Sequence, residues 1–132
     1  MQTAPGHPGY HSVTPYLVVR GVAPLMEFLK ATFDATELHR SSRPDGSVMH
    51  AEVRIGDSIV MMGEPTAGGE ETPASLYVYV EDTDGAYRRA LLAGATSIRE
   101  PADQPYGDRN AGVKGPSGTT WWIGTPLGKT TR

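Results

Sequence analysis

The alternation of hydrophobic and polar positions predicts a chain of short strands, interrupted by two helices. Residues 23–33 carry apolar side chains at helical spacing, with Pro24 tolerated in the first turn. Residues 82–93 form the second predicted helix, with Asp82 or Thr83 as its N-cap. Eight strands are predicted, over residues 13–19, 35–40, 47–55, 58–62, 75–80, 95–100, 110–114 and 119–123.

Turn residues separate these strands. Arg43-Pro44-Asp45-Gly46, Gly56-Asp57 and Gly115-Pro116-Ser117-Gly118 each combine residues that favour tight turns. Residues 64–73 form a polar, glycine-rich linker. Within the first strand, Pro15 cannot donate to a ladder, so we expect that strand to start irregularly or to lie at an edge.

The order strand, helix, strand, strand, strand occurs twice, and the residues repeat with it. Residues 16–19 resemble residues 77–80 at an offset of 61, and two further landmarks recur at offsets of 60 and 59. This predicts a duplicated unit and an α+β fold. We expect two βαβββ modules that form curved sheets around a concave cavity, with the helices on the convex faces. The expected organisation is a flexible arm (1–12), one domain (13–126) with modules at about 13–63 and 74–126, and a tail (127–132).

Composition excludes several classes of protein. The 132 residues carry a net charge of −3 without a run of Lys or Arg, so nucleic acid is not an expected partner. The sequence contains neither an apolar run of membrane-spanning length nor a signal peptide, which indicates a cytoplasmic protein without a membrane partner. The absence of cysteine excludes disulfides, thiolate metal sites and a cysteine nucleophile.

The last predicted strand carries bulky side chains on both faces. By strand alternation, Thr120 and Trp122 face one side, and Trp121 and Ile123 face the other. One of these faces belongs to the core. We therefore expect the other to meet a second apolar surface.

The duplicated modules, Tyr106-Gly-Asp-Arg and Gly-Pro-Ser-Gly-Thr-Thr-Trp-Trp ending at Trp122 resemble the vicinal oxygen chelate superfamily. That group contains glyoxalase I, bleomycin-resistance proteins and extradiol dioxygenases. The segment 49–58 resembles its small bacterial glyoxalase-like branch in particular. The resemblance extends over residues 13–126, and it implies a homodimer. One fold hosts many chemistries, so activity does not follow from it.

Metal-dependent members of this family place His and Glu ligands on the first, fourth, fifth and eighth strands. The corresponding positions here hold Thr14, either Val60 or Met62, Ser75 and Trp122. A divalent ion needs three or more convergent nitrogen or oxygen ligands, which these side chains do not supply. We therefore expect no metal ion and no other cofactor.

Aromatic side chains replace the expected ligands. Tyr77 and Tyr79 share the face of Ser75 and should line the same cavity as Thr120 and Trp122. Such a wall suits a planar or cationic small molecule through stacking and cation–π contact. The alternative is that these rings fill a collapsed cleft.

Two further residues are candidates with two interpretations each. His50, on the same predicted face as Glu52 and Arg54, is either a general base or a histidine of the core or a dimer interface. Arg109, next to Asp108, either binds a ligand carboxylate or phosphate at the cavity rim or pairs across strands.

Two functions follow. The first is metal-independent binding or sequestration of a small aromatic or cationic molecule, as in bleomycin resistance. The alternative is a lyase, isomerase or dioxygenase of the same superfamily. That enzyme would use an atypical metal site at His50 and Glu64, or acid–base chemistry at His50.

Overall fold

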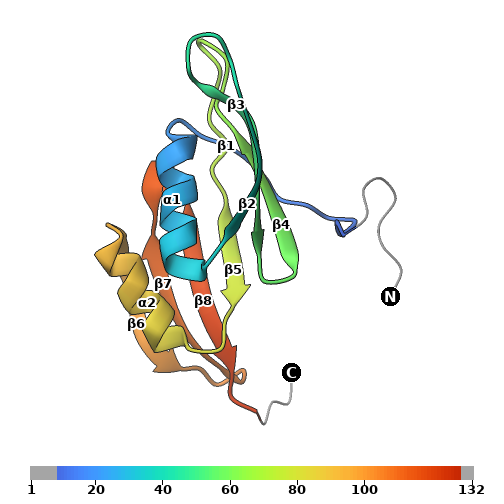
Figure 1. The fold of residues 1–132 in the computed structure, drawn as a ribbon. Helices are drawn as coiled ribbons and strands as arrows, with labels where there is room; N and C mark the ends of the chain where they lie inside the picture. Colours follow the sequence, from blue (N-terminus) through green and yellow to red (C-terminus); the bar gives the residue numbers. More distant parts are fainter. Residues whose placement is uncertain (1–8, 129–132) are drawn as a thin grey trace.

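A computed structural model describes residues 9–128 (Figure 1). It contains two four-stranded sheets and two α-helices, as the α+β prediction requires. Residues 1–8 of the expected arm and residues 129–132 of the expected tail lie outside the described residues. The elements in chain order are β1 (Tyr16–Val18), α1 (Val22–Phe33), β2 (Thr36–Ser42), β3 (Val48–Ile55), β4 (Ser58–Gly63), β5 (Ser75–Tyr79), α2 (Thr83–Leu92), β6 (Thr96–Asp103), β7 (Asp108–Lys114), a 3-10 turn (Pro116–Gly118) and β8 (Thr120–Pro126).

The two modules have the same topology. The strand order is β1-β4-β3-β2 in the first sheet and β5-β8-β7-β6 in the second. In each sheet the first strand is an edge strand that runs parallel to the fourth, and the other pairs are antiparallel. Tyr16 is opposite Met61, and Tyr77 is opposite Trp122, so both pairs are related by the offset of 61 that the sequence repeat showed. The predicted duplication is confirmed.

One hydrophobic core joins the modules. Its first part is built by α1 against the buried face of the first sheet, where Ala51 and Val53 are fully buried. Trp121 of β8 continues this core, because its ring packs against Phe28 and Phe33 of α1 with centroid distances of 6.5 and 5.8 Å. The two helices contact each other on the same side of the molecule (Figure 1). The opposite face of each sheet is left open.

The α2 helix begins as predicted. Asp82 is its N-cap, and its side chain accepts a hydrogen bond from the backbone N–H of Gly85 at 3.1 Å. Within residues 9–128, neither α1 nor α2 has the length and apolarity needed to cross a bilayer.

Strand β1 is shorter than predicted. It starts at Tyr16, because Pro15 has no N–H and contributes only its carbonyl oxygen, which accepts from the Met61 N–H at 2.9 Å. Thr14 therefore lies before the strand, where its hydroxyl donates to the carbonyl of His11 at 3.2 Å.

Of the two alternatives predicted for β4, Met62 does not face the cavity, whereas Val60 lines part of its wall. Both side chains are buried in the core beneath the first sheet. The tight turn at Gly56-Asp57 pairs Ile55 with Ser58, and this register puts Met61 opposite Glu52. The open face of β4 consequently carries Ile59 and Met61.

Candidate functional site

Five of the six predicted residues of the second module share the open face of the second sheet. Strand β5 presents Ser75, Tyr77 and Tyr79 there, and its register with β8 places Thr120 and Trp122 alongside them. Tyr77 is 39% exposed and Tyr79 51% exposed, whereas Trp121, on the other face of β8, is fully buried. The sequence pattern therefore separated the two tryptophans correctly.

The rings of Trp122 and Tyr77 lie flat on the sheet, above two glycines. A Cβ added at Gly112 would lie 2.6 Å from Cε3 of Trp122, and one added at Gly124 would lie 2.6 Å from Cε1 of Tyr77. Each ring thus occupies the space that the side chain of any residue other than glycine at position 112 or 124 would need. We call the surface formed by Trp122, Tyr77 and Tyr79 the aromatic platform.

Hydrogen bonds fix the tyrosines of the platform. The hydroxyls of Tyr77 and Tyr79 both donate to Oδ2 of Asp108, at 2.7 and 3.2 Å. The Nδ2 group of Asn110 donates to the hydroxyls of Tyr77 at 3.2 Å and Tyr106 at 2.7 Å. Asp108 and Asn110 are almost completely buried, with exposed fractions of 2% and 1%. Both side chains come from β7, and their hydrogen bonds hold the hydroxyl ends of the tyrosine rings in place.

Tyr77 remains a hydrogen-bond donor at physiological pH. Burial raises the pKa of its phenol to about 12; Asn110 opposes this rise, and the carboxylate of Asp108 adds to it. A phenol with such a pKa is neutral near pH 7. The Tyr77 hydroxyl therefore keeps its proton and its hydrogen bond to Asp108.

Arg99 of β6 lies over Trp122. Its guanidinium carbon is 5.3 Å from the ring centroid, and Nη1 donates to Oδ1 of Asn110 at 3.4 Å. The indole N–H of Trp122 donates to Oγ of Ser75 at 3.1 Å. Both the face and the edge of this ring thus have defined partners.

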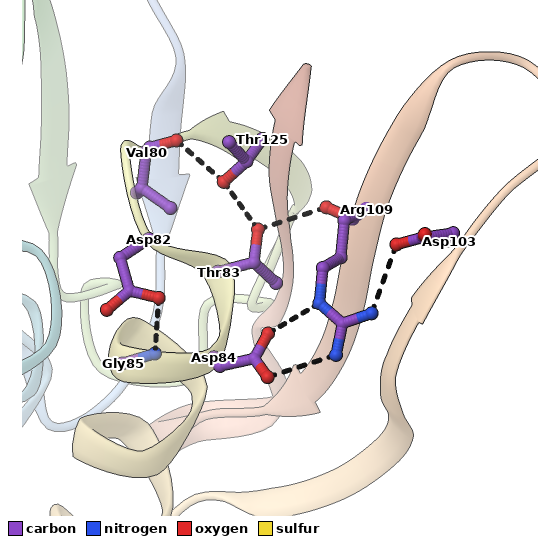
Figure 2. A network of polar contacts seen from close by, with 8 residues as sticks. All are labelled: Val80, Asp82, Thr83, Asp84, Gly85, Asp103, Arg109 and Thr125. Atoms are coloured by element: carbon purple, nitrogen blue, oxygen red, sulfur yellow. Dashed lines mark hydrogen bonds and ion pairs between the residues drawn. The ribbon is translucent and has the colours of Figure 1, made fainter. Parts of the chain in front are cut away.

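Arg109 lies on the opposite face of β7. Its guanidinium forms two contacts with Asp84 of α2, at 2.7 and 3.0 Å, and one with Asp103 of β6 at 3.0 Å (Figure 2). Hydrogen bonds to these carboxylates raise the pKa of Arg109. Strand alternation turns Arg109 away from Trp122, because Asn110 and Gly112 occupy the platform side. The structure shows the paired arginine of our second interpretation, and it does not bring Arg109 to the aromatic residues.

A cavity of about 330 Å³ lies where the two modules meet. Thr14 and the neighbouring arm residues form one wall, the turn between β3 and β4 forms another, and β5 closes the third side with Tyr77 and Tyr79. Thr14 is thus brought to the edge of the platform from outside strand β1.

His50 lies on the open face of the first sheet, within a second polar cluster. Its Nε2 is 2.7 Å from Oε2 of Glu52, and its Nδ1 is 3.4 Å from the hydroxyl of Tyr16. The hydroxyl of Tyr10 donates to the other oxygen of Glu52. Burial raises the pKa of Glu52, but the hydrogen bonds from Tyr10 and His50 together outweigh it and hold this pKa below its ordinary value. An ionised Glu52 can only accept, so Nε2 of His50 carries the proton.

The positions predicted to correspond to the family's metal ligands carry neither a carboxylate nor an imidazole. Thr14 lies before β1, Val60 and Met62 belong to the core, and Ser75 and Trp122 lie on the open face of the second sheet. In residues 9–128, no three His, Asp or Glu side chains come together in a geometry that could hold a metal. Glu64, the proposed partner of His50, instead accepts from the backbone N–H of Val48 at 3.3 Å.

Three further residues at the platform, Arg99, Asn110 and Gly112, were not predicted from the sequence. Asn110 and Gly112 could have been found, because they alternate on a predicted strand whose partner carries Trp122. Arg99 could not, since irregular pairing on both sides of it breaks the alternation of β6.

A family model described as the Glyoxalase/Bleomycin resistance protein/Dioxygenase superfamily matches residues 9–123. The chain is 36% identical over 127 residues to the "Uncharacterized protein Mb0911c" of Mycobacterium bovis, with 88% of this chain and 84% of that protein covered. The "Uncharacterized protein Rv0887c" of Mycobacterium tuberculosis is also 36% identical over 127 residues, with 88% of this chain and 75% of that protein covered.

Solved structures with the same architecture include TioX from Micromonospora sp. ML1. The TM-score is 0.72 at 25% identity, with 87% of this chain and 98% of TioX covered. The fosfomycin resistance protein FosX from Mesorhizobium loti gives a TM-score of 0.62 at 19% identity, with 95% and 93% covered. The likeness to FosX is one of fold alone.

Proposed function

This chain belongs to the glyoxalase/bleomycin resistance protein/dioxygenase superfamily, and on that premise we propose that it binds a planar small molecule on the aromatic platform. The proposed role is binding or sequestration without a metal ion or other cofactor. The observation that carries it is the arrangement of Trp122 and Tyr77, which lie flat over Gly112 and Gly124. The ring of Tyr77 presents its outer face, the part of an aromatic side chain on which another planar group stacks, and Trp122 with Arg99 over it lies beside this ring.

Burial and hydrogen bonding support a binding role for this face. Tyr77 and Tyr79 remain partly exposed, although a buried carboxylate and a buried amide hold their hydroxyls. Rigid aromatic side chains with fixed polar tips lose little conformational entropy when a ligand binds. The platform is therefore organised before a ligand arrives.

The chemistry of the platform favours binding over catalysis. Tyr77 has a pKa of about 12, and the carboxylate of Asp108 accepts from two phenols and is 2% exposed. Neither group is a ready proton acceptor at neutral pH. We therefore expect the ligand to leave this face unchanged.

The test is a binding screen followed by one substitution. Thermal shift with a panel of planar aromatic compounds identifies ligands, and isothermal titration calorimetry measures their affinity for the wild type and Trp122→Ala. We expect a loss of about tenfold or more, because the variant loses the apolar area of the indole ring and the ring that supports Arg99. Leu92→Ala is the matched control, since Leu92 is 88% exposed on α2, which packs on the face opposite the platform. Equal affinities for wild type and Trp122→Ala would exclude the platform as the binding site.

A second candidate function, acid–base catalysis at His50, is favoured by the short contact between His50 and Glu52. Glu52 fixes the imidazole with its proton on Nε2, which leaves Nδ1 as an acceptor facing Tyr16. This arrangement suits the removal of a proton from a carbon next to a carbonyl group.

Deuterium exchange tests this second function. In heavy water, NMR would follow exchange into a panel of 2-oxo acids, with wild type compared against His50→Gln. Exchange at the protein-free rate for every compound would rule out this chemistry for 2-oxo acids.

A further inference from the structure

Arg99, the cation that lies over Trp122, has no anionic partner among residues 9–128. Arg99 contacts the Trp122 ring and the Asn110 amide, and it forms no ion pair with any residue among 9–128. Among the arginines of residues 9–128, Arg20, Arg40 and Arg109 form ion pairs with carboxylates. Arg99 belongs to the remaining group, and it is the one that lies over Trp122.

The guanidinium of Arg99 is nevertheless held in place. Its central carbon lies over the indole ring at 5.3 Å from the centroid, and Nη1 donates to the buried Asn110. A guanidinium has five N–H donors, and these two contacts use few of them. The remaining donors are free to form the paired hydrogen bonds that a carboxylate accepts.

A second cation lies on the same face. Lys114 of β7 is opposite Thr120 of β8, two residues along from Gly112, so strand alternation directs it to the platform side. Lys114 is exposed and forms no ion pair with any residue of the described range. The carboxylate on this face, Asp108, is almost fully buried and accepts from two tyrosines. The exposed charge that β6 and β7 contribute to the platform is therefore positive, although Asp57 lines the adjoining cavity and the whole chain carries −3.

We propose that the ligand of the platform is a planar aromatic anion whose ring stacks on Tyr77, with the tilted ring of Tyr79 at its edge, and whose anionic group binds Arg99. This inference rests on the proposed function and narrows the expected class of aromatic or cationic ligands. The two tyrosine rings lie 5.0 Å apart, next to the position where Arg99 is anchored by Asn110. A ligand cation would be repelled by Arg99 and Lys114.

Three probes of one shape separate the effects of charge and stacking. They are naphthalene-2-carboxylate, the neutral naphthalene-2-carboxamide and the cationic naphthalen-2-ylmethylammonium, each titrated by calorimetry at low salt. We expect the anion to bind about tenfold more tightly than the amide, as one charge-assisted contact implies, and the cation to bind least tightly. Raised salt should reduce the preference for the anion.

The Arg99→Ala variant should lose most of this preference while its thermal stability stays unchanged, because Arg99 is exposed. Arg88→Ala, on the exposed surface of α2, removes the same charge elsewhere and should keep the preference. Equal binding of all three probes, tighter binding of the cation, or an unchanged preference in Arg99→Ala would overturn the anion inference. In each of those cases sensitivity to Trp122→Ala would still support the proposed function. If none of the probes binds, both proposals fail for aromatic ligands of this size.

Discussion

The indole ring of Trp122 lies directly over Gly112 on the neighbouring strand, at a distance that excludes a Cβ atom from that position. The pair explains how a large aromatic side chain lies flat on the sheet. Gly112 has no unusual backbone conformation, so the requirement for glycine comes from the ring alone. The geometry of the aromatic platform therefore depends on a residue without a side chain.

Gly112→Ala should displace the Trp122 ring. We expect the free energy of unfolding to fall by about 1–3 kcal/mol, the usual cost of overpacking, with weaker binding of any platform ligand. Urea denaturation measures the first effect. In the Trp122→Ala background the same substitution should cost much less, since the clash is gone. An equal cost in both backgrounds would contradict the packing described here.

Asn110→Ala should destabilise the protein through the hydrogen bonds of Tyr77 and Tyr106. The side chain is 1% exposed, and its Nδ2 group donates to both phenols. Removing a buried partner costs about 1–3 kcal/mol, which urea denaturation would detect. Tyr106→Phe removes only one of these bonds and should cost less.

Arg109→Ala should leave ligand affinity unchanged. Its guanidinium pairs with Asp84 and Asp103 on the face away from Trp122. These pairs are partly exposed, so we expect a small loss of stability that shrinks as salt is added. Calorimetry and thermal melting at two salt concentrations measure both quantities. A large loss of affinity would restore the interpretation of Arg109 as a ligand-binding residue.

The pH dependence of stability should report on Glu52. Its pKa in the folded protein is held below the ordinary value, so the unfolded chain binds the proton more readily. The contribution of Glu52 to stability is therefore complete above the pKa of the unfolded chain. It is lost as the pH falls through the lowered folded pKa. We expect urea denaturation to show the wild type more stable than Glu52→Gln near neutral pH, with a smaller difference at about pH 3. A difference that does not change with pH would contradict the ionised state of Glu52.

Local patterns predicted most of the fold. The two helices and eight strands follow from side-chain spacing and turn residues, and the repeat predicted the shared topology. Met62 was assigned to the wrong face of β4 because the pairing of Ile55 with Ser58, rather than local hydrophobicity, sets the register of this strand. An all-apolar strand does not show in its sequence which side is buried.

The candidate site was only partly predictable for a related reason. Tyr77 and Trp122 share a face by simple alternation, so they were found. The partners of Arg109 come from α2 and β6, and nothing local to Arg109 indicates that their carboxylates lie within reach. The irregular pairing of β6 concealed Arg99 in the same way.

The two adjacent tryptophans lie on opposite faces of β8 and have different contacts. Trp121 packs on Phe28 and Phe33 of the other module, whereas Trp122 lies on the open face with Arg99. A slip of one residue in the pairing of β8 would exchange them. Substitutions at these two adjacent positions are therefore expected to have separable effects. A change at position 121 should lower the stability of the fold, whereas under the proposed function a change at position 122 should alter ligand binding.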